Sequence, residues 1–204
     1  MCVRGFMMSI SSSRDVAQNN PVQIFYPLST VRCVGPVLFR DQLARDIACL
    51  LDVDDDVLSW SCQSLSLSND GQVYKPDFMV ERADVRFAVD GVRDDGAPDW
   101  AKAKSIDAGF PYEAIAASAL PRIRLKNAKD LLRYARYEAP LSDRIRLLAA
   151  LDEYSSLTLS EALIVFREIK PVAGLASMVL HRFIEMNLDE RLIGPETIVR
   201  RRRD

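Results

Sequence analysis

Two aspartates, Asp77 and Asp90, stand where a sequence pattern can support chemistry, because each lies beside a short apolar run that predicts a β-strand. Asp77 follows a proline, and Asp90 ends its apolar run. Two carboxylates on neighbouring strands can hold Mg²⁺, which prefers oxygen ligands, polarises a phosphate and acidifies a bound water. Asp77 and Asp90 are therefore the candidate catalytic and metal-ligating residues. A structural interpretation also stays open, in which Asp77 caps a strand and Asp90 is a turn residue before Gly91.

The elements that must position these carboxylates follow from the periodicity of the apolar residues. Helical spacing before residue 52 gives way to an alternation of period two, and Asp70-Gly71 favours the positive φ angles of a hairpin turn. The predicted helices and strands cover residues 37–52, 57–62, 65–67, 73–80, 85–89, 99–108 and 112–117, before a last helix that Asn127 caps. This order predicts one α/β unit over residues 23–139, preceded by a flexible arm over residues 1–22.

A second unit is predicted after Pro140, where the pattern becomes purely helical. Thr158 and Glu161 have the spacing of a capping box, and Pro171 separates their helix from another over residues 172–187. Residues 191–199 have the pattern of strand, turn and strand. Three helices and a terminal hairpin are typical of a winged helix-turn-helix, so we predict an independent, all-α winged-helix domain over residues 140–204.

The ordered set of motifs resembles the TnsA-type transposon endonuclease family over residues 37–199. The matching segments are Leu43-Ala44-Arg45-Asp46, Leu51 to Val57, Gln63, Tyr74 to Phe78, Gly109-Phe110-Pro111-Tyr112, the Asn127 helix and the C-terminal unit. The resemblance implies a restriction-endonuclease-like core of the PD-(D/E)xK type, with a mixed sheet flanked by helices, followed by a winged helix. It also implies Mg²⁺-dependent DNA cleavage by three acidic residues and a lysine, and contacts with transposase partners.

The chain departs from the family pattern at two of these four functional groups. The family glutamate falls on Ala44, which has no ligand atom, and the lysine falls on Val92, which cannot donate a hydrogen bond. By analogy with other preorganised donors, loss of the lysine alone lowers the rate by about 10²–10³. We therefore expect Asp77 and Asp90 to be remnants of a site that is inactive or weak.

Two further interpretations of the carboxylate pair stay open. Asp77 and Asp90 either keep weak metal binding, or a shifted site uses other charged residues. Asp41 lies three residues before the family glutamate position, so a helix places the two on nearly the same face. The other candidates for a shifted site are Arg93, Lys102 and Lys104.

Residues that bind DNA are expected in the second unit. In helix-turn-helix proteins the second helix of the motif enters the major groove, which here presents Ser177, His181 and Arg182. The apolar positions of that region, Leu175, Val179, Leu180 and Phe183, are predicted to be core. The basic run Arg200, Arg201, Arg202 and Arg203 is either a solvated end or a set of phosphate contacts.

Composition limits the class of protein. The 204 residues are 49% hydrophobic, which suffices for one core and a small satellite, and a net charge of −2 gives no general attraction to nucleic acid. No run is long and apolar enough for a membrane span, and the first residues do not resemble a signal peptide. The four cysteines form no C-x-x-C pair and there is one histidine, so we expect reduced thiols, no zinc site and a cytoplasmic protein.

The leading functional hypothesis is an inactive or weak TnsA-like protein from a mobile element that binds DNA or regulates a DNA-bound partner. One alternative is an active Mg²⁺-dependent endonuclease with a shifted site. Another is a protein-interaction module that contacts a transposase or a regulator. No cofactor is expected, apart from Mg²⁺ if the nuclease site is active, and no membrane partner is expected.

Overall fold

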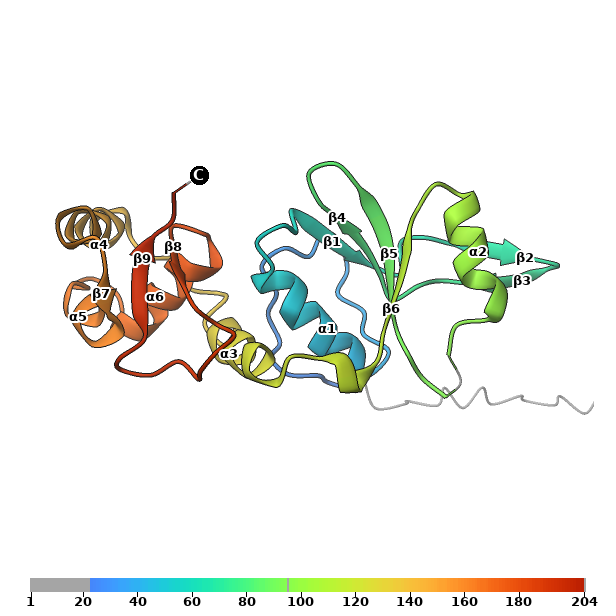
Figure 1. The fold of residues 1–204 in the computed structure, drawn as a ribbon, viewed down its shortest axis with the longest axis horizontal. Coiled ribbons are helices and arrows are strands. Elements are labelled where there is room, and N and C mark those ends of the chain that lie inside the picture. Colours follow the sequence, from blue (N-terminus) through green and yellow to red (C-terminus); the bar gives the residue numbers. More distant parts are fainter. Residues whose placement is uncertain (1–22, 95, 204) are drawn as a thin grey trace, which may run out of the picture.

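The computed structural model describes residues 23–94 and 96–203, so the predicted N-terminal arm lies outside the described residues (Figure 1). The first lobe contains α1 (Gln42–Val53), β1 (Ser59–Cys62), β2 (Leu67–Asn69), β3 (Gln72–Tyr74), β4 (Phe78–Glu81), β5 (Arg86–Gly91), α2 (Asp99–Asp107), β6 (Tyr112–Ile115), a 3-10 turn (Ala117–Ala119) and α3 (Arg122–Leu132). The second lobe contains α4 (Leu141–Tyr154), β7 (Leu157–Thr158), α5 (Leu159–Ile164), α6 (Pro171–Leu180), β8 (Ile184–Met186) and β9 (Ile198–Arg201).

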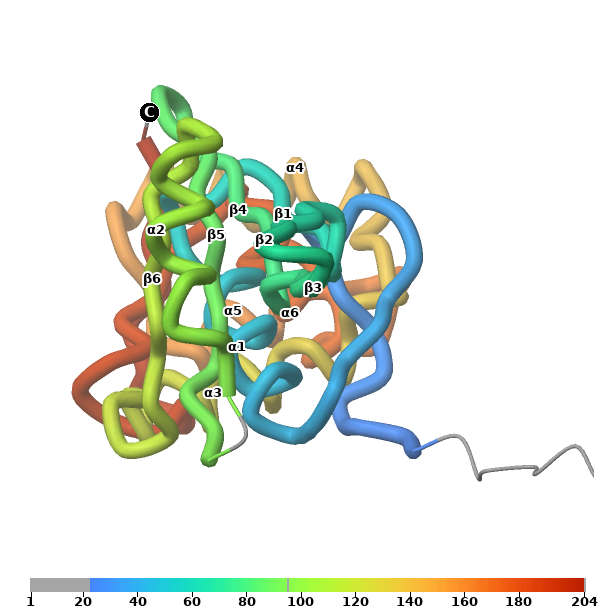
Figure 2. Tube along the Cα trace, turned by 90° about the vertical axis from the view of Figure 1, so that its right-hand side faces the viewer, coloured from blue at the N-terminus to red at the C-terminus, as the bar shows by residue number. Residues whose placement is uncertain are grey.

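The first lobe is built on a four-stranded mixed sheet, which confirms the predicted mixed sheet flanked by helices. Its strand order is β1-β4-β5-β6, visible from right to left in Figure 2; β6 runs parallel to β5, and the other pairs are antiparallel. Helix α1 covers one face, and its buried residues Ala44, Ile47, Ala48 and Leu51 recur at helical spacing. Helix α2 packs beside β6 and the β2–β3 hairpin.

The predicted hairpin turn at Asp70-Gly71 is confirmed, since both residues have positive φ angles and join β2 to β3. The prediction of one continuous strand over residues 73–80 is wrong. The chain leaves the hairpin at Lys75 and joins the main sheet at Phe78, because Pro76 has no N–H to donate to a strand ladder. Asp77 therefore stands at the entrance to β4.

Helix α1 begins at Gln42 and not at Val37 as predicted. Its N-cap is Asp41, whose carboxylate accepts a hydrogen bond of 2.8 Å from the Ala44 N–H. The prediction that Asn127 caps a helix is also wrong, because α3 begins at Arg122 and Asn127 is buried in its middle. Asparagine usually favours helix ends, and here its side chain bonds to a distant segment instead.

The prediction of an all-α second lobe is wrong, because it contains a three-stranded sheet in the order β7-β9-β8. The helix predicted over residues 172–187 ends at Leu180, and the next residues turn into β8 through Arg182, which has a φ angle of +61°. Residues 191–193 are not a strand. The capping box of Thr158 and Glu161 is confirmed, with both of its hydrogen bonds formed.

The two lobes meet at the C-terminal end of α1. Three arginines donate to the carbonyl oxygens that the helix leaves unpaired: Arg32 to Asp52, Arg124 to Val53 at 2.9 Å, and Arg182 to Asp54 at 2.8 Å. The positive charge of the arginines also matches the negative end of the helix dipole.

A buried apolar cluster crosses the predicted boundary at residue 140. Cys49, Leu131 and Leu132 of the first lobe pack with Ala176 and Leu180 of the second. Independent folding of residues 140–204 stays a prediction, and a fragment cut there exposes this cluster.

No helix in residues 23–94 and 96–203 is both long enough and apolar enough to cross a membrane. Cys33, Cys49 and Cys62 are free thiols, and Cys2 lies outside the described residues.

We predict that Asn127→Ala weakens the joint between the lobes. Its side-chain amide donates to the carbonyls of Leu188 and Arg191 at 2.9 and 2.8 Å, and it accepts from the Ile193 N–H at 3.0 Å. Because the substitution leaves buried partners unpaired, the free energy of unfolding should fall by about 3 kcal/mol in urea titrations. Asn69→Ala is the matched control, since the Asn69 amide bonds only to the adjacent Asp70, and it should change stability by less than about 0.5 kcal/mol. Equal effects of the two substitutions would contradict the prediction.

Candidate functional site

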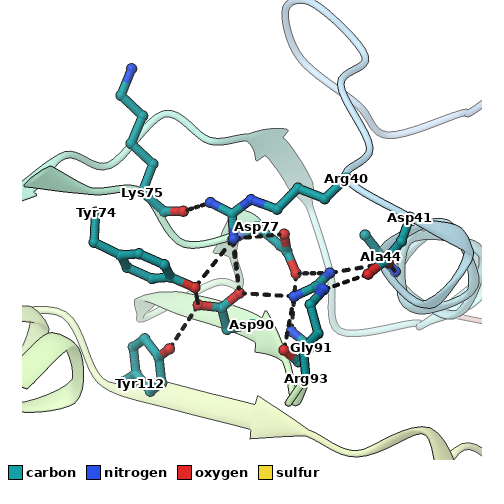
Figure 3. Close-up of polar contacts among 10 residues, drawn as sticks. All are labelled: Arg40, Asp41, Ala44, Tyr74, Lys75, Asp77, Asp90, Gly91, Arg93 and Tyr112. Atoms are coloured by element: carbon teal, nitrogen blue, oxygen red, sulfur yellow. Dashed lines mark hydrogen bonds and ion pairs between the residues drawn. The ribbon is translucent and has the colours of Figure 1, made fainter. Parts of the chain in front are cut away.

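The structure brings the two predicted carboxylates together. Strands β4 and β5 pair Phe78 with Val89, so Asp77 and Asp90 lie opposite each other at the next position of the ladder (Figure 3). Both are almost completely buried, with 2% and 1% of their surface exposed. The Asp77 N–H donates to Asp90 Oδ1 at 3.3 Å, and the Gly91 N–H donates to Asp77 Oδ2 at 3.0 Å. The backbone therefore fixes the relative position of the pair.

Arg93 enters this pair from the loop after β5. Its Nη2 lies 2.8 Å from Asp77 Oδ2, and its Nη1 lies 3.6 Å from Asp90 Oδ1 and 2.8 Å from the Gly91 carbonyl oxygen. Its Nε and Nη2 also bond to both carboxylate oxygens of Asp41. One guanidinium thus joins the N-cap of α1 to both carboxylates of the sheet (Figure 3).

Arg40, which precedes α1, approaches the pair from the other side. Its Nη1 lies 3.3 Å from Asp77 Oδ1 and 3.6 Å from Asp90 Oδ1. The same guanidinium bonds to the Lys75 carbonyl and lies over the ring of Tyr74, 5.1 Å from its centroid. Arg40 is the more exposed of the two arginines, with 29% of its side chain accessible against 14% for Arg93.

Two tyrosines complete the contacts of Asp90. The hydroxyls of Tyr74 and Tyr112 donate to Asp90 Oδ2 at 2.5 and 2.7 Å. Burial, followed by the hydrogen bond to the Asp90 carboxylate, raises the pKa of Tyr74 to about 12 and raises the pKa of Tyr112 further. Both phenols therefore stay protonated and remain hydrogen-bond donors near neutral pH.

The carboxylates of the cluster respond differently to their surroundings. The hydrogen bond from Arg93 holds the pKa of Asp41 below its usual range. Burial raises the pKa of Asp77, and the adjacent Asp90 carboxylate adds to that rise, while the Gly91 N–H and Arg93 oppose it. The pKa of the Arg93 guanidinium is raised, because its bonds to Asp41 and Asp77 outweigh the opposing effect of burial. Arg93 is therefore a permanent cation within the cluster.

This arrangement does not fit the Mg²⁺ ion that the family resemblance implies. Mg²⁺ needs near-octahedral oxygen ligands at about 2.0–2.1 Å, but Asp77 Oδ2 and the Gly91 carbonyl already contact Arg93, and Asp90 Oδ2 accepts two phenols. Repulsion between the ion and a guanidinium is about 4 kcal/mol per pair of unit charges at 4 Å and an effective dielectric of 20. Among the described residues, no group of three or more His, Cys, Asp or Glu side chains is arranged to hold a metal ion.

The other residues expected in or near this site divide into two groups. Asp41 and Arg93, proposed for a shifted site, are part of the cluster, whereas Val92 offers only an apolar side chain and is 52% exposed. Ala44 is buried and contributes only its backbone N–H. Lys102 lines a cavity of about 350 Å³ that opens onto Asp90 and Arg93. Within the described residues, neither Lys102 nor Lys104 forms an ion pair with a carboxylate.

Sequence reasoning missed three members of the cluster, Arg40, Tyr74 and Tyr112. Tyr74 stands three residues before Asp77, and Tyr112 occupies the strand that pairs with β5, so their places on neighbouring strands were a usable signal. Arg40 lies outside any predicted strand, and no periodicity pointed to it.

Of the residues expected to contact DNA bases, most bond to other parts of the protein. Ser177 is 3% exposed, and its hydroxyl accepts from the Ala139 N–H at 3.1 Å. Arg182 bonds to the first lobe, and His181 remains exposed at the end of α6. Phe183, predicted to be core, is 36% exposed and lies beneath the Arg144 guanidinium.

The four C-terminal arginines do not form a free basic end. Arg200 and Arg201 belong to β9, Arg201 pairs with Asp152, and Arg202 pairs with Asp55 of the first lobe. Within the part of the chain that the structure describes, Arg200 and Arg203 form no ion pair. Only these two are therefore available for contacts with phosphate.

We predict that Asp41→Asn destabilises the protein in a pH-dependent way. The folded state lowers the pKa of Asp41, so this carboxylate stabilises the fold above its unfolded pKa of about 3.9, and the contribution disappears as the pH falls through the lower folded value. Asparagine retains the helix cap. Because Asp41 is 37% exposed, solvent screening limits the effect at pH 7 to about 1 kcal/mol.

Thermal melts of wild type and variant from pH 7 to pH 3 measure this difference. The melting curves should converge at the acidic end. Asp56→Asn, at an exposed aspartate, serves as the control and should melt like wild type throughout. A difference that does not shrink at all as the pH falls below about 3.9 would show that Asp41 does not act through its charge.

Comparison with known proteins assigns the chain to no family: no protein-family model matches it, and no curated protein matches it either. The resemblance to TnsA-type endonucleases rests on the sequence motifs quoted above. The function of the chain is therefore inferred from its own contacts.

Proposed function

We propose that this chain is a non-hydrolytic relative of the TnsA-type endonucleases, a cytoplasmic binding protein that holds DNA or a DNA-bound partner. The observation that carries the proposal is the placement of Arg93 and Arg40 between Asp77 and Asp90. The two guanidinium groups occupy the space that a catalytic metal needs and neutralise carboxylates that would otherwise repel DNA phosphates.

The arrangement of the sheet and of the second lobe supports this assignment. Two carboxylates that lie opposite each other on neighbouring strands of a mixed sheet, with a helix packed on one face, are the framework that a restriction-endonuclease-like core requires. The second lobe has the order helix, strand, helix, helix, strand, strand, which is typical of a winged helix whose wing is the β8–β9 ribbon. Free thiols at Cys33, Cys49 and Cys62 support a reducing compartment.

The proposed contact with DNA is to phosphates and not to bases. Helix α6 occupies the position of a recognition helix, but Leu175, Ser177 and Met178 are buried within it and cannot reach a groove. Arg200 and Arg203 extend from the ribbon without partners among the described residues. Arginines at such a place fix orientation on the duplex and carry no sequence information.

A protein-interaction module is the second candidate function. It is favoured by the internal use of Ser177, Arg182, Arg201 and Arg202, which leaves few polar groups for DNA. In that case the partner is of the transposase or regulator type.

The wild-type chain should not cleave DNA. Incubation of supercoiled plasmid with Mg²⁺ or Mn²⁺ should leave the fraction of nicked plasmid equal to that of an Asp77→Ala variant prepared in parallel. Nicking that depends on the metal and disappears in Asp77→Ala would establish instead an active endonuclease with a shifted site.

The salt dependence of DNA affinity should come in part from Arg200 and Arg203. If Arg200 and Arg203 contact phosphates, Arg200→Gln/Arg203→Gln should reduce the steepness of log affinity against log salt by about 1.8, at about 0.9 for each contact. Substitution is preferable to deletion, because Arg200 and Arg201 form part of β9. Gel shifts on mixed-sequence duplexes at several salt concentrations measure the slope, with Arg86→Gln on the first lobe as the control. An unchanged slope and affinity would favour the protein-interaction module.

A further inference from the structure

The guanidinium of Arg93 lies in a nest of oxygen atoms that resembles the environment of a bound cation. The surrounding atoms are both carboxylate oxygens of Asp41, Asp77 Oδ2, Asp90 Oδ1 and the carbonyl oxygen of Gly91. They come from the start of α1, the entrance to β4 and the end of β5, and they converge on one side chain (Figure 3). Carboxylate and carbonyl oxygens are the ligands that Mg²⁺, Ca²⁺ and Mn²⁺ prefer.

An unpartnered atom within the cluster points to the same conclusion. Asp77 Oδ1 is buried and has no hydrogen-bond partner, although its residue is only 2% exposed. The nearest positive charge, on Arg40, lies 3.3 Å away without hydrogen-bond geometry. This ion pair compensates part of the lost hydration, but buried carboxylate oxygens are seldom left without a hydrogen bond. The oxygen framework therefore offers more acceptor capacity than the two arginines satisfy.

We propose that Arg93 is an internal substitute for a divalent cation, seated in a latent cation site formed by Asp41, Asp77, Asp90 and the Gly91 carbonyl. The site is latent because, with Arg93 in place, these side chains are not arranged to hold a metal ion. In this site Asp41 supplies the helix carboxylate that Ala44 lacks, from one turn earlier along the chain. The proposal rests on the proposed function, because it explains how the carboxylates stay paired without a metal. The latent site differs from a nuclease site in two ways: its third carboxylate is that of Asp41, and its cation, the Arg93 guanidinium, is covalently attached to the chain.

Because Arg93 is covalently part of the chain, its positive charge cannot leave the cluster. The guanidinium cannot be removed by chelation, so the cluster stays intact in EDTA. Replacement of Arg93 by a neutral residue leaves three carboxylates with Arg40 beside two of them, so an exchangeable cation can take the place of the lost charge. Variants at this position should therefore gain metal binding that the wild type lacks.

Calorimetric titration with Mn²⁺ at pH 7 tests the proposal on the full chain without DNA. Arg93→Gln should bind one Mn²⁺ per chain, roughly tenfold or more tighter than wild type, because the competing cation is gone. Asp41→Asn in the Arg93→Gln background should weaken this binding by roughly tenfold, because one charged ligand is lost. Arg82→Gln is the matched control, since Arg82 pairs with a single carboxylate, that of Asp54, and should gain no Mn²⁺ binding.

Thermal melts provide a second measurement in case Arg93→Gln is unstable. Addition of Mn²⁺ should raise the melting temperature of Arg93→Gln and leave those of the wild type and Arg82→Gln unchanged. Binding of Mn²⁺ by Arg93→Gln that is no tighter than that of the wild type, or a melting temperature that does not respond to Mn²⁺, would overturn the proposal. Plasmid nicking by the wild type bears only on the proposed function, and Mn²⁺ binding by Arg93→Gln bears only on the latent site, so the two can fail separately.

Discussion

Helix α1 is the constraint on which both ends of the molecule depend. At its start, the Asp41 side chain caps the helix and also holds Arg93 in the carboxylate cluster. At its end, Arg32, Arg124 and Arg182 bind the carbonyl oxygens that the helix cannot pair internally. Each terminus of an α-helix leaves four backbone groups unsatisfied. Here the helix's own N-cap, Asp41, binds an N–H at the start, and arginines from other segments bind carbonyl oxygens at the end. One helix therefore links the candidate site to the joint between the lobes.

In the cluster around Asp77 and Asp90, arginine and tyrosine side chains stabilise a buried pair of carboxylates. Two adjacent buried carboxylates repel each other and lose their hydration, so they need a cation or protons. Here Arg93 and Arg40 supply positive charge, and Tyr74 supplies a hydrogen bond whose proton is held by a raised pKa. Arginine suits this role because its planar group donates in several directions at once. The same geometry places the Arg93 guanidinium beside both carboxylates.

In the second lobe, polar side chains that the sequence suggested for DNA recognition hold the protein's own segments together instead. Arg182 and Arg202 bind the first lobe, and Ser177 holds the segment that leads into α4. Helix α6 is buried because it packs on both the core of its own lobe and the cluster shared with α3. Under the proposed function, the surface for a partner is therefore the β8–β9 ribbon with Arg200 and Arg203, which form no ion pair within residues 23–94 and 96–203, and not the helix.

The sequence by itself determined that short apolar strands lie beside Asp77 and Asp90, because apolar patterns act over a few residues. It did not give the interruption at Pro76, which divides residues 73–80 between β3 and β4. It also determined the Asp70-Gly71 turn and the capping box at Thr158, which are local hydrogen-bond and φ preferences. Tertiary structure alone decided where Arg93 and Asn127 bond. The side chains of Arg93 and Asn127 bond to residues that are distant along the chain. Neither the periodicity of apolar residues nor local propensity predicts such contacts. The presence of Asp77 and Asp90 beside two strands was therefore readable from the sequence, and their ion pairs with Arg40 and Arg93 were not.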